Sequence, residues 1–484
     1  MENDFILVLD LGGPEAVLMA RKLRNQRYYT EILARSADAE LLLRKSPRGI
    51  LIAGGEGGAL ENFPRAALSL GIPVLALGGA ARMLAQAEGA ECEGTQLTDK
   101  VAQITFQPCD LFDSLGASDR FVQRIDAFRL PGGFKPIATT LDGLVPGFAD
   151  FDRSLYALQF YPESNDPDGA VILSNFAERI CGCTPFWSME NYIRREIDYI
   201  RDRVGNRKAL LAVSGGVDSA ACALLMGRAI GDRLTCVFVD NGLLREGEAE
   251  AVLTAYREEL GIEPLRIDAR DRFLGWLKGL SDPVEKRRAM YNVYLDVLTE
   301  VFEEQGAGII AQGTIYSDLL NDGPSARGFD PDRLIEPLRM LFKDEVRDLG
   351  EQLGLPHSFI DRQSFPGPGL ALRCCGEVTP EKLELLRRAD AIFREEVAAS
   401  GQDKRLAQYF AVLTDTPALT RSGHFGNALV LRAVTGQSAD SFAPGRLPND
   451  LMDRTAQRIG RELPDIGRVV YDITGSDSAT VEWE

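Results

Sequence analysis

The feature that most constrains this 484-residue sequence is a glycine- and serine-rich stretch that follows an apolar run. The run is Lys208-Ala209-Leu210-Leu211-Ala212-Val213, and the stretch is Ser214-Gly215-Gly216-Val217-Asp218-Ser219. An apolar run without polar alternation predicts a buried parallel strand, and a helix is expected from Ala220 to Ile230. A second strand, expected at Leu234–Val239, completes a strand–helix–strand unit. This order predicts an α/β fold with a loop after the first strand.

The composition of this loop predicts an anion-binding site. Its two glycines allow a tight turn that brings backbone N–H groups close to a phosphate, and the helix N-terminus and serine hydroxyls add donors. Asp218 is expected to hold Mg²⁺, which would offset the phosphate charge. A simpler interpretation is a serine–glycine turn that only caps the helix, although the full string after a strand disfavours it. No G-x-x-x-x-G-K-S/T string occurs, so the loop is not a P-loop.

Other parts of the chain show the same alternation of strands and helices. Residues 1–185 contain apolar strands that end in glycines, which predicts a second parallel sheet covered on both faces. A boundary is expected near 183–187, and a third region begins at about Phe365 with a glycine–proline turn. Outside the loop region, strands are expected at 5–9, 49–53, 73–77 and 468–473, and helices at 190–203 and 380–399.

Bulk composition excludes several classes of protein. Hydrophobic residues make up 45% of the chain and charged residues 26%, as in folded globular proteins, and a net charge of -18 argues against a nucleic-acid partner. No run of 18 apolar residues exists, and the N-terminus lacks a signal-peptide pattern. Eight cysteines in a chain of this length do not indicate a disulfide framework. We therefore expect a cytoplasmic enzyme with no membrane segment.

The loop string also matches the pyrophosphate-binding signature of the N-type ATP pyrophosphatases, which cleave ATP between its α and β phosphates. Further segments follow in the order found in the GMP synthetase family, which the chain resembles over nearly its whole length. The resemblance implies a glutamine amidotransferase-like domain at 1–185, an ATP pyrophosphatase domain at 186–364 and a small α+β dimerisation domain at 365–484. The matching segments are Cys236–Arg245, Ala311–Tyr316, Leu341–Arg347, Phe365–Gly369, Tyr471–Gly475 and Ala479–Glu484.

The resemblance also implies roles for individual residues. Lys343 is the expected cation for the phosphates and for charge that develops during the reaction, and Asp218 is the expected catalytic and Mg²⁺-binding carboxylate. Lys343 could instead be a solvated helix lysine. Asp240 could contact Mg²⁺ or ribose, or could only cap the following turn. The residues implied to bind ATP are Ser214, Gly215, Gly216, Val217, Asp218, Ser219, Ala220, Val239, Asp240 and Gly313.

By this resemblance the chain transfers AMP to a carbonyl oxygen of a purine-nucleotide-like acceptor and releases pyrophosphate. Ammonia then displaces the activated oxygen. ATP and Mg²⁺ are the implied cofactors, and a homodimer through residues 365–484 is the implied assembly.

The first domain lacks the residues that glutamine hydrolysis requires. A class I glutaminase needs a cysteine nucleophile on a strand-to-helix turn and a histidine base. The family's G-V-C-Y-G-M-Q stretch reads Ala76-Leu77-Gly78-Gly79-Ala80-Ala81-Arg82 here, which places Gly78 at the nucleophile. The family's F-H-P-E motif retains Glu163 but has Tyr161 in place of the base. We therefore expect no glutamine hydrolysis, with ammonia taken up free or supplied by a separate glutaminase.

Three segments that the family uses around xanthosine monophosphate are altered. The paired-histidine loop is replaced by residues 321–330, and the terminal G-K-P-P is replaced by Gly475-Ser476-Asp477-Ser478. Thr414, Arg421 and Gly423 stand where the family has Arg, Asp and Arg. These changes favour an altered acceptor, and a diverged but true GMP synthetase is the alternative.

Two further hypotheses follow from the same residues. Cys374 and Cys375 could deliver sulfur to the activated acceptor, or could simply pack a domain junction. The chain could also be a nucleotide-binding pseudoenzyme, although its complete loop and Lys343 argue against that.

Overall fold

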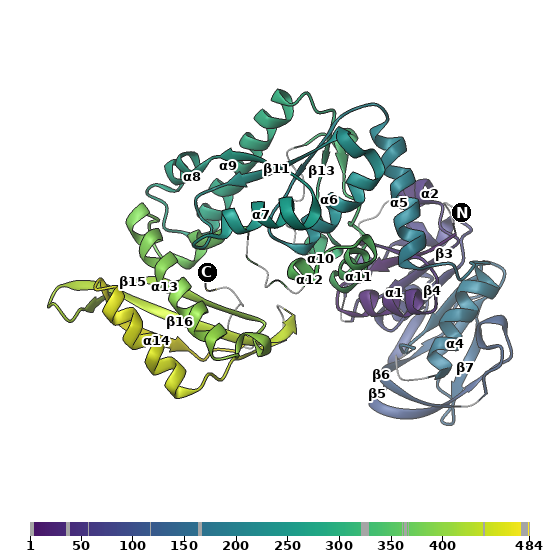
Figure 1. Ribbon diagram of the computed structural model, residues 1–484. Helices are drawn as coiled ribbons and strands as arrows, with labels where there is room; N and C mark the ends of the chain where they lie inside the picture. The colour runs from purple at the N-terminus through teal and green to yellow at the C-terminus, as the bar shows by residue number, and fades with distance from the viewer. Residues whose placement is uncertain are drawn as a thin grey trace. The chain divides into compact units, whose positions relative to one another are not determined.

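The computed structural model describes residues 4–34, 39–56, 58–116, 118–162, 167–320, 329–360, 362, 365, 367–438, 441–475 and 483. The chain forms two compact units, Met1–Tyr192 and Ile193–Glu484 (Figure 1). The division falls inside helix α5 (Met189–Val204). Over the described ranges, no helix is both long and apolar enough to cross a membrane.

The N-terminal unit is built on one nine-stranded sheet in the order β2-β1-β3-β4-β9-β8-β7-β5-β6. The first five strands in this order pair in parallel, and the pairs from β9 onward are antiparallel. The parallel strands are β1 (Ile6–Asp10), β2 (Thr30–Ala34), β3 (Gly49–Ala53), β4 (Val74–Leu77) and β9 (Leu155–Leu158). The antiparallel strands are β5 (Glu91–Phe106), β6 (Ser118–Arg129), β7 (Lys135–Thr140) and β8 (Gly147–Asp150).

The parallel half of this sheet confirms the predicted α/β fold. Every residue of β3 and β4 is buried, as expected for strands covered on both faces. The antiparallel half was not predicted, because its strands lack continuous apolar runs. The helices that belong to this unit alone are α1 (Glu15–Asn25), α2 (Ala39–Lys45), α3 (Gly79–Ala87) and α4 (Pro167–Asn175).

The second unit contains a five-stranded, fully parallel sheet in the order β12-β11-β10-β13-β14. Its strands are β10 (Ala209–Ala212), β11 (Leu234–Asp240), β12 (Leu265–Asp268), β13 (Ile309–Ala311) and β14 (Leu334–Ile335). Its helices are α6 (Val217–Ile230), α7 (Glu248–Leu260), α8 (Arg270–Leu277), α9 (Pro283–Glu304), α10 (Tyr316–Leu320), α11 (Lys343–Leu353) and α12 (His357–Ile360). The strand–loop–helix predicted around residues 208–230 is therefore present as β10 and α6.

The remainder of the second unit is an α+β region, as predicted. Antiparallel strands β15, β16 and β17 lie in sequence, and β18 joins β16 in parallel. The elements are α13 (Pro380–Ala399), β15 (Gln408–Leu419), β16 (Phe425–Ser438), β17 (Ser441–Pro444), α14 (Asn449–Glu462) and β18 (Ile466–Asp472).

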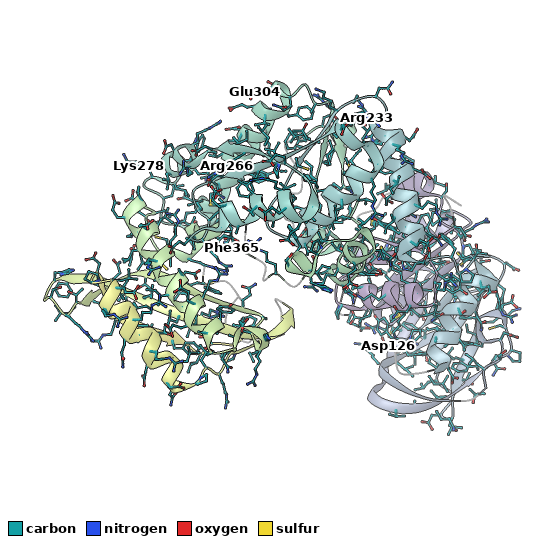
Figure 2. All side chains as sticks on the ribbon, viewed as in Figure 1. Asp126, Arg233, Arg266, Lys278, Glu304 and Phe365 are labelled. Atoms are coloured by element: carbon teal, nitrogen blue, oxygen red, sulfur yellow. The ribbon has the colours of Figure 1, made fainter. Side chains whose placement is uncertain are left out.

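One hydrophobic cluster joins the parallel sheet of the second unit to its C-terminal region. It joins Leu210 of β10 to Leu386 and Phe393 of α13 and to Leu429 of β16. Phe365, labelled in Figure 2, packs against the same cluster. The C-terminal region and the parallel sheet therefore share a core, which explains why they form a single compact unit.

The glycine–proline turn fixes the chain where these two regions meet. Gly369 has a φ of 59°, and the N–H of Leu370 donates to the Leu243 carbonyl oxygen over 2.8 Å. A Cβ atom on Gly369 would collide with that carbonyl oxygen. Only glycine adopts this backbone conformation at low cost.

We predict that Gly369→Ala lowers the free energy of unfolding of the second unit by about 1–3 kcal/mol, because it forces a left-handed backbone on alanine and disturbs the Leu370 hydrogen bond. Gly367→Ala in the same turn is the matched control, since a Cβ there meets nothing within 4 Å. Urea unfolding followed by circular dichroism measures both. Equal midpoints for the two variants would contradict the role assigned to Gly369.

Candidate active site

The loop between β10 and α6 is held in shape by its own serines. The Ser214 N–H donates to Ser219 Oγ over 3.0 Å, and the two serine hydroxyls lie 3.0 Å apart. The Gly216 N–H donates to Ser214 Oγ over 3.2 Å. From α7, the Tyr256 hydroxyl donates to the Ser214 carbonyl oxygen over 3.0 Å. These bonds fix the loop before any ligand arrives.

Helix α6 begins at Val217, directly after this loop, and no side chain in the described ranges caps its N-terminus. The first N–H groups of a helix have no partners within the helix and carry a partial positive charge. The loop and the helix start therefore present donors to an anion, in the arrangement by which helix N-termini bind phosphate.

The structure brings Asp218 and Lys343 together at this loop. Asp218 lies in the first turn of α6, and Lys343 is the first residue of α11. The Lys343 Nζ donates to Asp218 Oδ2 over 2.6 Å, and both side chains are partly exposed. Because Lys343 lies beside the phosphate-binding loop, its ammonium group can turn from the carboxylate to pair with an incoming phosphate.

The same carboxylate fits a divalent cation that is shared with phosphate. Asp218 Oδ1 is buried and has no hydrogen-bond partner among the residues that the structure describes. Mg²⁺ is usually bound by one or two carboxylates together with substrate phosphates and waters. Among the described residues, no group of three His, Cys, Asp or Glu side chains could hold a metal alone. The fit is therefore to an ion that arrives with the nucleotide.

Gly313 follows strand β13, and Val239 lies on strand β11; both strands neighbour β10, which leads into the loop. A Cβ atom on Gly313 would lie 3.1 Å from the Asp218 carbonyl oxygen, so the chain after β13 passes close to the start of α6. Val239 lies near the carboxyl end of β11, next to β10 in the sheet. Parallel strands of α/β sheets bind ligands at this edge.

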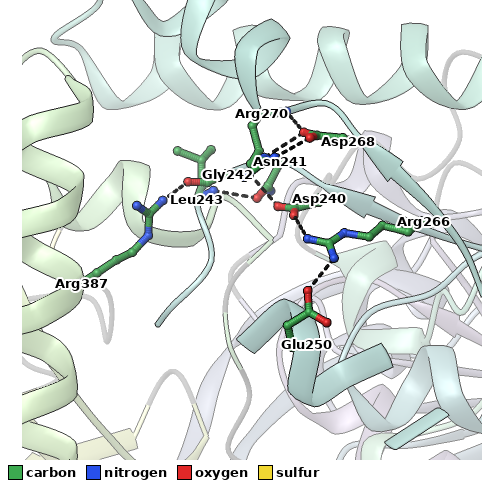
Figure 3. Close-up of polar contacts among 9 residues, drawn as sticks. All are labelled: Asp240, Asn241, Gly242, Leu243, Glu250, Arg266, Asp268, Arg270 and Arg387. Carbon is green, nitrogen blue, oxygen red and sulfur yellow. Dashed lines mark hydrogen bonds and ion pairs between the residues drawn. The ribbon is translucent and has the colours of Figure 1, made fainter. Parts of the chain in front are cut away.

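The Asp240 carboxylate is engaged within its own turn (Figure 3). Its Oδ1 accepts a hydrogen bond from the Gly242 N–H over 3.1 Å, and its Oδ2 pairs with Arg266 over 2.8 Å. Arg266 also pairs with Glu250 over 2.5 Å. Of the roles considered for Asp240, the turn-capping contact is present in the structure.

Sequence reasoning missed two polar side chains that contact this loop. One is Tyr256, described above. The other is Arg362, whose guanidinium carbon would lie 2.8 Å from a Cβ atom on Gly215. Arg362 also pairs with Glu248 over 3.0 Å. Its position just before the glycine–proline turn is the one sequence signal that could have drawn attention to it.

Asp318 adds a further carboxylate near the Asp218–Lys343 pair. The pKa of Asp318 is raised, mainly because the carboxyl group is buried. A hydrogen bond from the Ile315 N–H to Asp318 Oδ2, over 2.9 Å, acts in the opposite direction and partly offsets this effect. The Asp218 charge raises this pKa and the Lys343 charge lowers it. The phosphate loop therefore has acidic and basic groups on its α10 and α11 side.

A second strand-to-helix turn, between β4 and α3, lies in the N-terminal unit. Gly78 occupies it with φ 59° and ψ −123°. A Cβ atom on Gly78 would collide with the ring and hydroxyl of Tyr161. The Tyr161 hydroxyl accepts hydrogen bonds from the Gly54 N–H, over 3.2 Å, and from the Gly79 N–H. Burial raises the pKa of Tyr161, so the hydroxyl stays protonated.

Two backbone N–H groups that converge on one oxygen form the geometry of an oxyanion hole. Here the Tyr161 hydroxyl takes both donors. Beside it, buried Arg82 pairs with Glu56 over 2.7 Å and with Asp126 over 3.3 Å. Glu163, the acid retained from the family motif, lies outside the described residues.

The altered acceptor segments are only partly visible in the structure. Residues 321–328 and 476–478 lie outside the described residues. Thr414 on β15 donates its hydroxyl hydrogen to the Ala428 carbonyl oxygen over 2.8 Å, within the sheet. Arg421 and Gly423 belong to the exposed turn between β15 and β16. Cys374 is fully buried in the hydrophobic cluster, consistent with the packing role considered for it.

The fold and the two turns define a class of protein. A class I amidotransferase-like unit precedes a parallel sheet with an ATP pyrophosphatase loop, and an α+β region follows. Comparison with known families agrees. Residues 7–180 match the glutamine amidotransferase class-I family, and residues 395–483 match the GMP synthase C terminal domain.

Relatives match along the whole chain. A protein named glutamine-hydrolyzing GMP synthase from Clostridium acetobutylicum is 38% identical over 510 residues, covering 100% of both chains. A protein of the same name from Thermomicrobium roseum is 41% identical over 513 residues, covering 99% of this chain and 97% of the relative. The chain belongs to the GMP synthase family. It is a ligase that uses ATP and forms AMP and pyrophosphate, which confirms the predicted class of enzyme.

We predict that Lys343→Met lowers the rate of pyrophosphate release by at least about 10²-fold, because the charge that develops on the phosphates loses its cation. Lys382→Met is the matched control, since Lys382 also pairs with an aspartate, Asp415, but lies on α13. A coupled pyrophosphate assay at saturating ATP compares the two variants. Equal rates would mean that Lys343 is an ordinary surface lysine.

Proposed function

We propose that this chain is a GMP-synthase-like ligase that aminates a purine-nucleotide-like acceptor with ammonia and does not hydrolyse glutamine. One observation carries the second half of the proposal. The Tyr161 hydroxyl occupies the two N–H donors beside Gly78, where a glutaminase needs a nucleophile and an open oxyanion hole.

The reaction begins when a carbonyl oxygen of the acceptor attacks the α-phosphorus of ATP. The bond between the α-phosphorus and the bridging oxygen breaks, and pyrophosphate leaves. Ammonia then adds to the activated carbon, and AMP departs with the former carbonyl oxygen. The overall change replaces a carbonyl oxygen with an amino group.

The residues around the loop fit the first of these steps. The N–H groups of the loop that do not donate to its serines would hold the β and γ phosphates, and Lys343 would neutralise charge on the leaving pyrophosphate. Asp218 would hold Mg²⁺ through its unpartnered Oδ1. When bound, the ion supplies Lewis-acid neutralisation of the phosphate oxygens.

The nitrogen would come from free ammonia or from a separate glutaminase. Gly78 has no side chain to attack an amide, and the only histidines, His357 and His424, lie in the second unit. Arg82 and Asp126 fill the adjoining space with a buried ion-pair network. We infer that the N-terminal unit is kept for packing or docking and not for catalysis.

The acceptor would differ from xanthosine monophosphate. Thr414 stands where the family has an arginine, and its hydroxyl is bonded within the sheet. Each charge-assisted hydrogen bond to a phosphate contributes about 1.5–3 kcal/mol, so loss of such cations weakens that contact. The ATP loop is complete while the acceptor segments have changed, which is the pattern expected when the acceptor changes and the activation chemistry does not.

A second candidate function is the ammonia-dependent conversion of xanthosine monophosphate to GMP. The observation that favours it is the 38–41% identity, over the whole chain, to proteins named GMP synthase. In that case other residues hold the nucleotide.

We predict that protein with ATP, Mg²⁺ and ammonium releases no pyrophosphate with xanthosine monophosphate, and does so with another purine-like nucleotide that carries a ring carbonyl. The measurement is a pyrophosphate assay across a nucleotide panel, with mass spectrometry of the products and Lys343→Met as the blank. GMP from xanthosine monophosphate would favour the second candidate. Binding of ATP without release for any acceptor would overturn both.

We also propose a homodimer through the C-terminal sheet. Leu419 and Phe425 face each other across the β15–β16 hairpin and are 57% and 75% exposed, and Val470 of β18 is 43% exposed. These side chains lie on three strands of one sheet, and exposed large apolar side chains are typical of an interface.

For this dimer we predict that Phe425→Asp weakens self-association at least tenfold, since it places a charge in an apolar contact. Leu141→Asp, at an 80% exposed leucine of the N-terminal unit, is the control. Sedimentation velocity reports the mass of each. A monomeric parent protein, or a dimer that tolerates Phe425→Asp, would contradict the proposed interface.

A further inference from the structure

A small cavity rich in arginine lies at the start of α7, within the second unit. Its volume is about 250 Å³. Ligand pockets for drug-sized molecules are usually about 300–1,000 Å³, so this cavity suits a small ion or one end of a larger ligand. It is lined by Arg245, Glu246, Gly247, Glu248, Ala251, Arg362 and Arg394.

Two of these arginines have a buried Nε that donates no hydrogen bond to any described residue. Arg245 is buried, and its Nε has no hydrogen-bond partner among the described residues. Asp390 Oδ2 forms an ion pair with this Nε over a longer distance of 3.7 Å. The Arg245 guanidinium stacks on the ring of Phe365, 4.4 Å from its centroid. Arg394, on α13, has a buried Nε without a partner, and it forms no hydrogen bond or ion pair within the described part of the chain.

The nearby carboxylates are already engaged with other groups. Glu248 pairs with Arg362 over 3.0 Å and accepts from the Arg245 N–H over 3.3 Å. Glu246 lies 3.7 Å from Arg388, which does not line the cavity. Asp390 Oδ1 accepts from the Ala411 N–H over 2.9 Å, and Asp390 Oδ2, 3.7 Å from Arg245 Nε, has no hydrogen-bond partner among the described residues. The Nε atoms of Arg245 and Arg394 therefore have no hydrogen-bond acceptor in the described part of the chain.

Arg245 and Arg394 both carry positive charge and repel each other. Burial lowers the pKa of Arg245, and the Arg394 charge lowers it further, against the opposing effect of Asp390. An anion between the two guanidinium groups would remove the repulsion and supply the missing acceptors. The planar fork of arginine matches phosphoryl oxygens in a bidentate way.

We propose that the cavity of Arg245, Arg362 and Arg394 binds a phosphoryl group, as a second anion site beside the ATP loop. Arg362 connects the two sites, since its guanidinium lies against Gly215 of the loop and pairs with Glu248 in the cavity. The proposed phosphoryl site does not depend on which acceptor or nitrogen source the enzyme uses. Its phosphoryl group would come from the acceptor nucleotide or from the pyrophosphate released from ATP.

The test measures binding and not turnover, so it remains informative if the proposed reaction is wrong. The ATP loop is first saturated with α,β-methylene-ATP, and inorganic phosphate is titrated calorimetrically into the parent protein and Arg394→Met. The expected result is an approximately tenfold or greater loss of phosphate affinity in the variant, with unchanged affinity for the ATP analogue. Arg461→Met, at a 75% exposed arginine on α14, should match the parent.

Arg394→Lys keeps the positive charge but removes the planar guanidinium, so this variant should bind phosphate with intermediate affinity. It also serves as a control in case Arg394→Met fails to fold. Xanthosine monophosphate and pyrophosphate, titrated in parallel into protein without the ATP analogue, distinguish the sources. A loss confined to the nucleotide assigns the site to the acceptor, and a loss confined to pyrophosphate assigns it to the leaving group. If Arg394→Met binds all three probes as the parent does, the proposal is overturned.

Discussion

Both candidate sites depend on one backbone constraint: a helix that starts directly after a buried parallel strand leaves its first N–H groups in need of acceptors. At β10–α6, no side chain caps the helix, and the serines bond to one another and to the loop backbone, so donors remain for phosphate. At β4–α3, the Tyr161 hydroxyl supplies the acceptor from within the protein. The same local structure is therefore open to a ligand in one unit and closed by a side chain in the other.

The second unit places its charges around the open turn. Lys343 and Asp218 pair at the start of α6, and the Arg362 guanidinium lies against Gly215 of the loop. A single hydrophobic cluster joins β10 to α13, the helix that carries Arg394, so the C-terminal region packs on the parallel sheet through a shared core.

Much of the fold followed from continuous apolar runs. The strands predicted at 49–53 and 73–77 are β3 and β4, because a strand buried on both faces needs no polar alternation. The antiparallel half of the first sheet could not be found this way, since β5 begins Glu91-Cys92-Glu93-Gly94. Gly78 and Tyr161 were recognised by resemblance, but the close packing of the Tyr161 ring on Gly78 and the two hydrogen bonds to Tyr161 arise only when segments 83 residues apart meet. Arg362 and Arg394 carry no motif, so only the tertiary structure reveals them.

The central claim is that nitrogen does not come from glutamine hydrolysed by this chain. The most direct test supplies purified protein with amide-¹⁵N-labelled glutamine, ATP, Mg²⁺ and acceptor, and measures glutamate release and ¹⁵N in the product. The account predicts no glutamate above the rate without protein, and label in the product only when ¹⁵N-ammonium replaces glutamine. Glutamate formed in step with pyrophosphate, with label in the product, would contradict it.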